Sequence, residues 1–135
     1  MPAAQATWTQ QAAEKWARDL YVKVDKKDAT GFAAVFADDA WIRFGNNAPV
    51  IGRSNIEAAI AQFFTAMITL SHEFVRITLH EKLLFLEASV TYRRHDKGMV
   101  TVPAMTVFQM EGRGERPVAE RCNIYVDLAP LFAAS

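Results

Sequence analysis

The segment FADDAWIRFGNNAPVIGRSNIEAAIAQFFTAM, residues 36–67, encodes a short strand followed by an amphipathic helix. Residues 40–44 predict the strand. After it, Ser54-Asn55-Ile56-Glu57 fits a capping box, in which a serine and a glutamate three positions later satisfy the free N–H groups of a helix start. Apolar residues then recur at helical spacing and form one stripe: Ile56, Ala59, Ile60, Phe63, Phe64 and Met67. A helix is therefore expected from about Ser54 to Met67.

Two more helices are predicted upstream of this segment. The first follows from apolar residues that recur every four positions: Trp8, Ala12, Trp16 and Leu20. The second is short, over about residues 29–36, with Asp28 placed as its N-cap. The N-terminal half of the chain is thus mainly helical.

Downstream, the sequence reads as strands. Four are expected, at about residues 71–79, 83–93, 100–110 and 119–127. Short turn-like sequences separate them, which predicts an antiparallel meander. Helices first and strands afterwards, without βαβ alternation, indicate an α+β fold.

Composition excludes several partners. The chain has 135 residues, and its fifteen basic side chains are balanced by fifteen acidic ones. Without a net positive field, nucleic acid is not an expected partner. The longest uncharged stretch, residues 58–71, is too short for a membrane span and carries polar residues, so no membrane association is expected.

Cys122 is the single cysteine of the chain, so an intrachain disulfide is impossible. That suits a reducing compartment, and no basic and apolar leader pattern opens the sequence. We therefore expect a soluble cytoplasmic protein.

The order of several short motifs resembles a known family. Phe36-Ala37-Asp38-Asp39-Ala40 follows the second helix, the strand ends in Phe44-Gly45-Asn46, and Pro49-x-x-Gly52-Arg53 precedes the third helix. Together with Glu87-Ala88-Ser89-Val90-Thr91-Tyr92 and residues 121–131, this order resembles the SnoaL-like group of the nuclear transport factor 2-like superfamily. The similarity runs over nearly the whole chain.

The resemblance implies one domain over residues 1–135. Its fold would be a cone-shaped, curved antiparallel sheet wrapped around three N-terminal helices and enclosing a cavity, a cystatin-like α+β barrel. Members of this group usually form homodimers, and a homodimer through the outer face of the sheet is expected here. The superfamily includes ketosteroid isomerases, limonene epoxide hydrolases, polyketide cyclases, dehydratases and noncatalytic proteins.

The catalytic positions of the two best understood relatives are occupied by apolar residues. The ketosteroid isomerase base and oxyanion-hole positions correspond to Phe44, Leu20 and Met105. The limonene epoxide hydrolase positions correspond to an equally apolar set: Ile42, Phe44, Ala88, Val90 and Ile124. Neither mechanism fits this chain.

The same positions predict an apolar cavity, because strand side chains alternate between faces and these positions point inward in the relatives. Its expected walls are Phe44, Ile42, Val90, Met105, Val107 and Ile124, with Trp16, Leu20, Phe63 and Met67 contributed by the helices. The expected ligand is a hydrophobic small molecule. The alternative is that these residues form an ordinary core, since core and pocket lining look alike in sequence.

Three polar residues are candidates for catalysis: Tyr92, His72 and Asn46. Tyr92 has the inward parity of its strand, and dehydratases of the superfamily use a histidine as general base. The alternative for His72 is a half-exposed residue at a strand start. His72-Glu73 and His80-Glu81 begin like the zinc motif H-E-x-x-H, but the second histidine is missing from both, so no metal and no cofactor are expected.

Two functional classes remain open. One is a cofactor-free enzyme that cyclises, isomerises or dehydrates a hydrophobic substrate; the other is a noncatalytic module that binds an apolar ligand or dimerises. On the outward face, Glu87 and Arg121 are expected to lie on neighbouring strands and to pair structurally.

Overall fold

The computed structural model describes residues 8–113 and 116–132. Its helices are α1 (Gln10–Asp25), α2 (Ala29–Ala33), α3 (Arg53–Thr65) and α4 (Ala129–Phe132). Its strands are β1 (Phe36–Phe44), β2 (Val50–Ile51), β3 (Met67–His80), β4 (Leu83–Arg94), β5 (Met99–Arg113) and β6 (Arg116–Val126).

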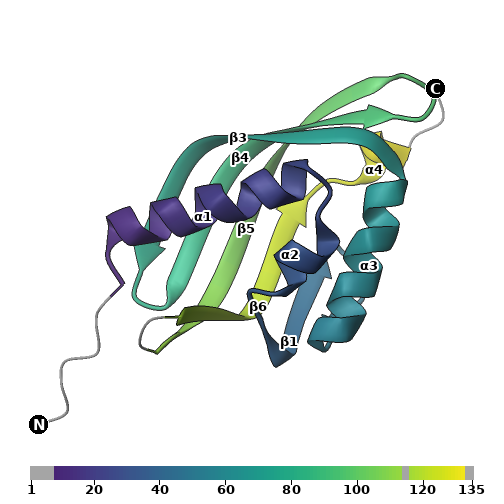
Figure 1. The fold of residues 1–135 in the computed structure, drawn as a ribbon. Coiled ribbons are helices and arrows are strands. Elements are labelled where there is room, and N and C mark those ends of the chain that lie inside the picture. The colour runs from purple at the N-terminus through teal and green to yellow at the C-terminus, as the bar shows by residue number, and fades with distance from the viewer. Residues whose placement is uncertain (1–7, 114–115, 133–135) are drawn as a thin grey trace, which may run out of the picture.

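The strands form one curved six-stranded sheet in the order β2-β1-β6-β5-β4-β3. Strands β3 to β6 make the predicted meander, whereas β1 pairs with β6 in parallel, a pairing that the sequence pattern did not predict. Helix α1 crosses the concave face, and α2 and α3 lie beside it (Figure 1). The α+β prediction is confirmed, and the sheet is curved but not closed, with β2 and β3 at its edges.

Helix starts are fixed by local chemistry. The Thr9 hydroxyl accepts from the Ala12 N–H at 3.0 Å, and Asp28 accepts from the Gly31 N–H at 2.9 Å, which confirms Asp28 as an N-cap. The capping box predicted at Ser54 is wrong. Helix α3 begins at Arg53 after Gly52, whose φ of 95° belongs to a region that favours glycine.

The start of β3 also differs from the prediction. Helix α3 ends at Thr65, so Met67 belongs to the strand rather than to the helical stripe. His72 consequently lies inside a fourteen-residue strand and not at its start.

Two residues predicted on the inner face of β5 lie on the outer face. The buried side chains of β5 occupy the even positions: Val102, Ala104, Thr106, Phe108 and Met110. Met105 pairs with Tyr125, which is 59% exposed, and Val107 pairs with Asn123. A register error of one residue moves a whole strand to the other face, and this is the error in that prediction.

The predicted pair of Glu87 and Arg121 is also wrong. Glu87 lies on β4 and Arg121 on β6, and β5 separates the two strands. Arg121 instead places its guanidinium over the Trp41 ring, 4.2 Å from the centroid. Glu87 lies opposite Arg76 of β3 on one side and Met105 of β5 on the other.

Aromatic contacts join the helices to the sheet. Trp16 of α1 packs edge-on against Phe108 of β5 with ring centroids 5.3 Å apart, and Phe36 at the start of β1 lies 6.1 Å from the same ring. Phe108 is fully buried. This cluster anchors α1 on the concave face of the sheet.

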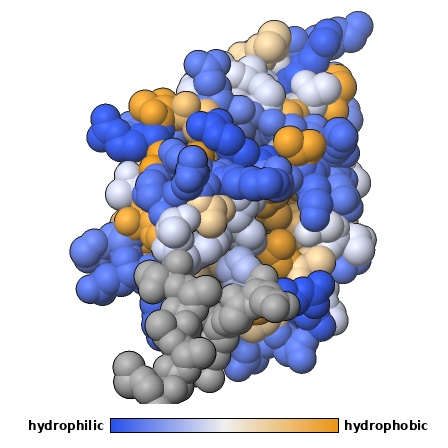
Figure 2. Space-filling view, turned by 60° about the vertical axis from the view of Figure 1, so that its left-hand side comes forward, coloured by the Kyte–Doolittle hydropathy of each residue, from blue (hydrophilic) through white to orange (hydrophobic). Residues whose placement is uncertain are grey.

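The side of the molecule where α1 begins has a mainly hydrophilic surface. Figure 2 shows hydrophilic residues predominating there, with hydrophobic ones in separate groups between them. Within residues 8–113 and 116–132, no helix has the length and apolar character needed to cross a membrane.

Candidate functional site

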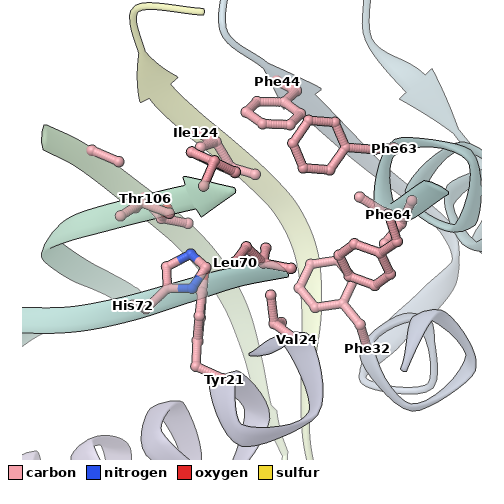
Figure 3. A pocket seen from close by; sticks show the side chains of 14 residues that line it. Tyr21, Val24, Phe32, Phe44, Phe63, Phe64, Leu70, His72, Thr106 and Ile124 are labelled. Carbon is pink, nitrogen blue, oxygen red and sulfur yellow. The ribbon is translucent and has the colours of Figure 1, made fainter. Parts of the chain in front are cut away.

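A small cavity lies on the concave face of the sheet, under α1 and α3. Its volume is about 50 Å³, and its walls are almost entirely apolar and aromatic (Figure 3). Four side chains bring polar groups to this lining: Tyr21 from α1, His72 from β3, Tyr92 from β4 and Thr106 from β5. The cavity is thus an apolar space with a few polar groups, the usual character of a small-molecule site.

His72 forms the most specific polar contact of the cavity. Its Nδ1 lies 2.7 Å from Oδ1 of Asp25, and its backbone N–H donates to Oδ2 of the same carboxylate at 3.1 Å. The side chain of His72 is 11% exposed and that of Asp25 is 31% exposed. A carboxylate accepts and does not donate, so it holds the Nδ1–H tautomer of the neutral ring and leaves the Nε2 lone pair available.

The position of Asp25 costs stability by itself. Asp25 is the last residue of α1, where the helix dipole is negative and a carboxylate is disfavoured by about 0.3–1 kcal/mol. Its two hydrogen bonds to His72 offset that cost. An acidic residue at this end of a helix, directed at a histidine that lines a cavity, is a feature that packing alone does not require.

Tyr21 lies against His72 from the side of α1. Their ring centroids are 4.7 Å apart in an edge-to-face arrangement. Burial raises the pKa of the Tyr21 phenol far above its ordinary value, and a hydrogen bond with Thr106 acts in the opposite direction. Tyr21 is therefore a neutral hydrogen-bond donor at physiological pH.

Tyr92 brings a second phenol to the cavity from β4. It is 3% exposed, and its ring lies 5.9 Å from that of Phe63. Burial, and to a smaller degree the negative charge of Asp25, raise the pKa of Tyr92. Burial is the main reason that both phenols are protonated, and the negative charge of Asp25 adds a smaller contribution in the same direction.

The ten residues that the sequence predicts as cavity walls lie in different parts of the structure. Four of the ten expected wall residues line the cavity: Phe44, Phe63, Val90 and Ile124. Three pack in the core without lining it: Trp16, Leu20 and Met67. Met105 and Val107 lie on the outer face, and Ile42 lines a separate groove beside α3.

Of the three polar candidates, two reach the cavity. His72 and Tyr92 line it, whereas Asn46 lines a separate hollow with Arg43 and Tyr125. Asn46 follows the end of β1 and lies in the turn after it, and it is not part of the cavity lining. The structure therefore does not bring Asn46 together with the other two.

Three residues of the site were not predicted. Tyr21 follows Ala13 and Ala17 at four-residue spacing, and this second apolar row of α1 was the available signal. Thr106 lies in the buried row of even-numbered residues of β5, and all the other side chains of that row are apolar. Asp25 gave no local signal, because it is 47 residues from His72 in sequence.

Other reactive groups are not arranged for chemistry. Cys122 is fully buried, and burial raises the pKa of its thiol, so the nucleophilic thiolate is disfavoured. In the described part of the chain, no three His, Cys, Asp or Glu side chains gather in a way that could hold a metal ion.

Comparisons with known proteins agree with this fold. The family model of the SnoaL-like domain matches residues 17–116. A presumed SnoaL-like polyketide cyclase from Jannaschia sp. CCS1 superposes with a TM-score of 0.78 at 16% identity, over 99% of this chain and 96% of that one. A presumed scytalone dehydratase from Novosphingobium aromaticivorans gives a TM-score of 0.71 at 15% identity, over 87% and 83% of the two chains.

A third structure, from Catenulispora acidiphila, has a ketosteroid isomerase-like fold and was solved with trimethylamine. It gives a TM-score of 0.76 at 14% identity, over 87% of this chain and 88% of that one. At these identities the similarity shows the fold alone. No curated protein sequence matches the chain.

Proposed function

Because the chain belongs to the SnoaL-like domain family, and because its cavity holds a carboxylate-oriented histidine, we propose that it is a cofactor-free acid–base enzyme acting on a hydrophobic carbonyl compound. The reaction begins with removal of a proton from the carbon next to the carbonyl group. That step is common to cyclisation, isomerisation and dehydration. The observation that carries the proposal is the 2.7 Å contact between His72 Nδ1 and Asp25 Oδ1.

His72 is the general base. Within the described residues, its Nε2 has no hydrogen-bond partner, and the ring lines the cavity. When Nε2 accepts a proton, the imidazolium is stabilised by the adjacent Asp25 carboxylate. The electron pair of the broken C–H bond moves to the carbonyl, which becomes an enolate.

The phenols of Tyr92 and Tyr21 supply the complementary group. Both are neutral, since burial raises the pKa of each. A neutral phenol in an apolar, water-poor cavity donates a hydrogen bond to an enolate oxygen more strongly than to the starting carbonyl, because negative charge develops there during the reaction. Tyr92, on the sheet, is the first candidate for this role.

The proposal can be tested without knowing the natural substrate. In D₂O, the protein should catalyse exchange of the α-protons of a small ketone such as 2-butanone, followed by proton NMR. His72→Gln should reduce the protein-catalysed rate by about 100-fold or more, since general-base catalysis contributes about 10²–10⁴. Ser71→Ala, on the exposed side of the same strand, is the matched control and should exchange at the wild-type rate.

Tyr92→Phe should slow exchange less than His72→Gln does, because Tyr21 still provides a donor. If the wild type does not accelerate exchange of any ketone but is stabilised by binding one, the noncatalytic alternative holds. Such stabilisation is a rise in melting temperature that grows with ligand concentration.

A further inference from the structure

The cavity is too small for the ligand that its chemistry suggests. Its volume is about 50 Å³, whereas small-molecule sites usually span roughly 300–1,000 Å³. His72 therefore faces a space large enough for a small polar head, while the remainder of a larger molecule must lie elsewhere.

A second hollow begins where the cavity ends. It is a groove of about 290 Å³ between α3 and β1, which we call the α3 groove, and apolar side chains predominate in its lining. Phe44, Ile60 and Phe63 line both the groove and the cavity. These three side chains are the wall between the two spaces.

The wall consists mainly of two aromatic rings. Phe44 and Phe63 meet edge to face with centroids 4.7 Å apart, and both are half-buried. In Figure 3 the two rings lie together on the side of the cavity opposite His72 and Tyr21. Phe63 lies on α3, and a change in its side-chain rotamer moves the ring without moving the helix.

The lining of the α3 groove includes an exposed aromatic side chain. Phe132 of α4 lines it and is 61% exposed, and Ala59 lines its α3 side. A large aromatic side chain left exposed beside an apolar groove is unfavourable in water and becomes favourable when a ligand covers it.

We propose that the cavity and the α3 groove form one elongated site, with Phe63 as the movable partition between them. The site takes a molecule with a carbonyl head and an unbranched or flat apolar tail: the head reaches His72, and the tail lies in the groove against Phe132. Phe63 thereby determines which tail lengths are accepted. This inference rests on the proposed function for the placement of the head.

The test is α-proton exchange along the series from 2-butanone to 2-nonanone. Burial of one methylene group raises kcat/KM about fourfold, and 2-nonanone has about five more of these groups than 2-butanone. In the wild type, kcat/KM for 2-nonanone should therefore be at least about 100 times that for 2-butanone. Ala59→Trp fills the groove and should lower that ratio at least about tenfold. Ala58→Trp, on the exposed side of α3, is the matched control and should keep the wild-type ratio.

Phe63→Ala removes the partition and should raise the ratio above that of the wild type. A wild-type ratio near one, with 2-butanone still exchanged, overturns the elongated site and leaves the proposed function standing. If no ketone is exchanged, melting temperatures along the same series replace the rates. Stabilisation that grows with chain length in the wild type and not in Ala59→Trp then supports the site, and its absence overturns it.

Discussion

Replacing Asp25 by asparagine separates the orienting role of this carboxylate from its contribution to stability. In the wild type, Oδ2 accepts from the His72 backbone N–H at 3.1 Å, and Oδ1 lies 2.7 Å from Nδ1. An asparagine must turn its oxygen toward the backbone N–H, because the opposite orientation places two donors against each other. Its NH₂ group then faces Nδ1 and forces the ring proton onto Nε2.

The expected magnitudes differ for the two properties. Asp25→Ala loses two hydrogen bonds to a charged acceptor, each worth about 1.5–3 kcal/mol when fully made. The Asp25 side chain is 31% exposed, so water replaces part of this hydrogen bonding in the variant. We therefore expect the free energy of unfolding to fall by about 2–3 kcal/mol, which lowers the melting temperature by about 7–10 °C for a chain of this size. Asp25→Asn keeps two neutral hydrogen bonds and should cost about 1 kcal/mol. Its catalysis should nevertheless fall by about 10²–10⁴, because Nε2 no longer accepts a proton.

Long-range proton–nitrogen NMR of the imidazole ring measures the tautomer directly, and urea unfolding measures stability. We expect the Nδ1–H tautomer in the neutral wild type and the Nε2–H tautomer in Asp25→Asn. The reasoning is refuted if the wild type carries its proton on Nε2, or if Asp25→Asn keeps the proton on Nδ1. Equal stability losses in the alanine and asparagine variants would also contradict it.

Two further predictions concern the sheet and its buried acids. We propose that the chain forms a homodimer through the outer face of the sheet, where Met105 and Val107 lie. Sedimentation should give a mass of twice 15.1 kDa for the wild type and a monomer mass for Met105→Glu. A wild-type mass of 15.1 kDa would exclude the dimer. Burial raises the pKa values of Cys122, Tyr21 and Tyr92 above their ordinary values of 9.0, 10.0 and 10.0. The free energy of unfolding should therefore be constant below about pH 9 and fall as the pH rises further, because the unfolded chain loses these protons first. The fall is up to about 1.4 kcal/mol per pH unit for each group. Urea unfolding between pH 8 and 11 should show a shallower fall for Tyr92→Phe, and identical slopes would contradict the assignment.

The periodic parts of the chain were predictable from sequence. Helical spacing identified α1 and α3, and alternation with short turns identified β3 to β6 and their antiparallel order. These signals are local, because each helix or strand must bury its own apolar side against the rest of the domain. The resemblance to the SnoaL-like group added the curvature of the sheet.

The face of β5 was the main error, although the chain contained the information. Thr101, Pro103 and Gln109 place polar or ladder-breaking residues at odd positions of β5, and this marks those positions as the outer face. The inward positions of β5 were instead assigned by alignment with other families, and this assignment placed Met105 and Val107 on the wrong face of the sheet. Alternation within a strand is more dependable than such an alignment, because one residue of slippage reverses every side chain.

The sequence alone determined the α+β class, the apolar character of the concave face and the inward direction of Tyr92, and it offered His72 as a candidate whose alternative was a half-exposed position at a strand start. The tertiary structure decided which acid accompanies the histidine, since Asp25 and His72 are 47 residues apart and meet where the end of α1 packs on β3. It also decided the size of the cavity, because the Phe44 and Phe63 rings that separate it from the α3 groove come from different elements. Periodicity in the sequence indicates which face of each helix or strand is buried. The contacts between these faces depend on the crossing angles of the elements, and packing of the whole domain sets those angles.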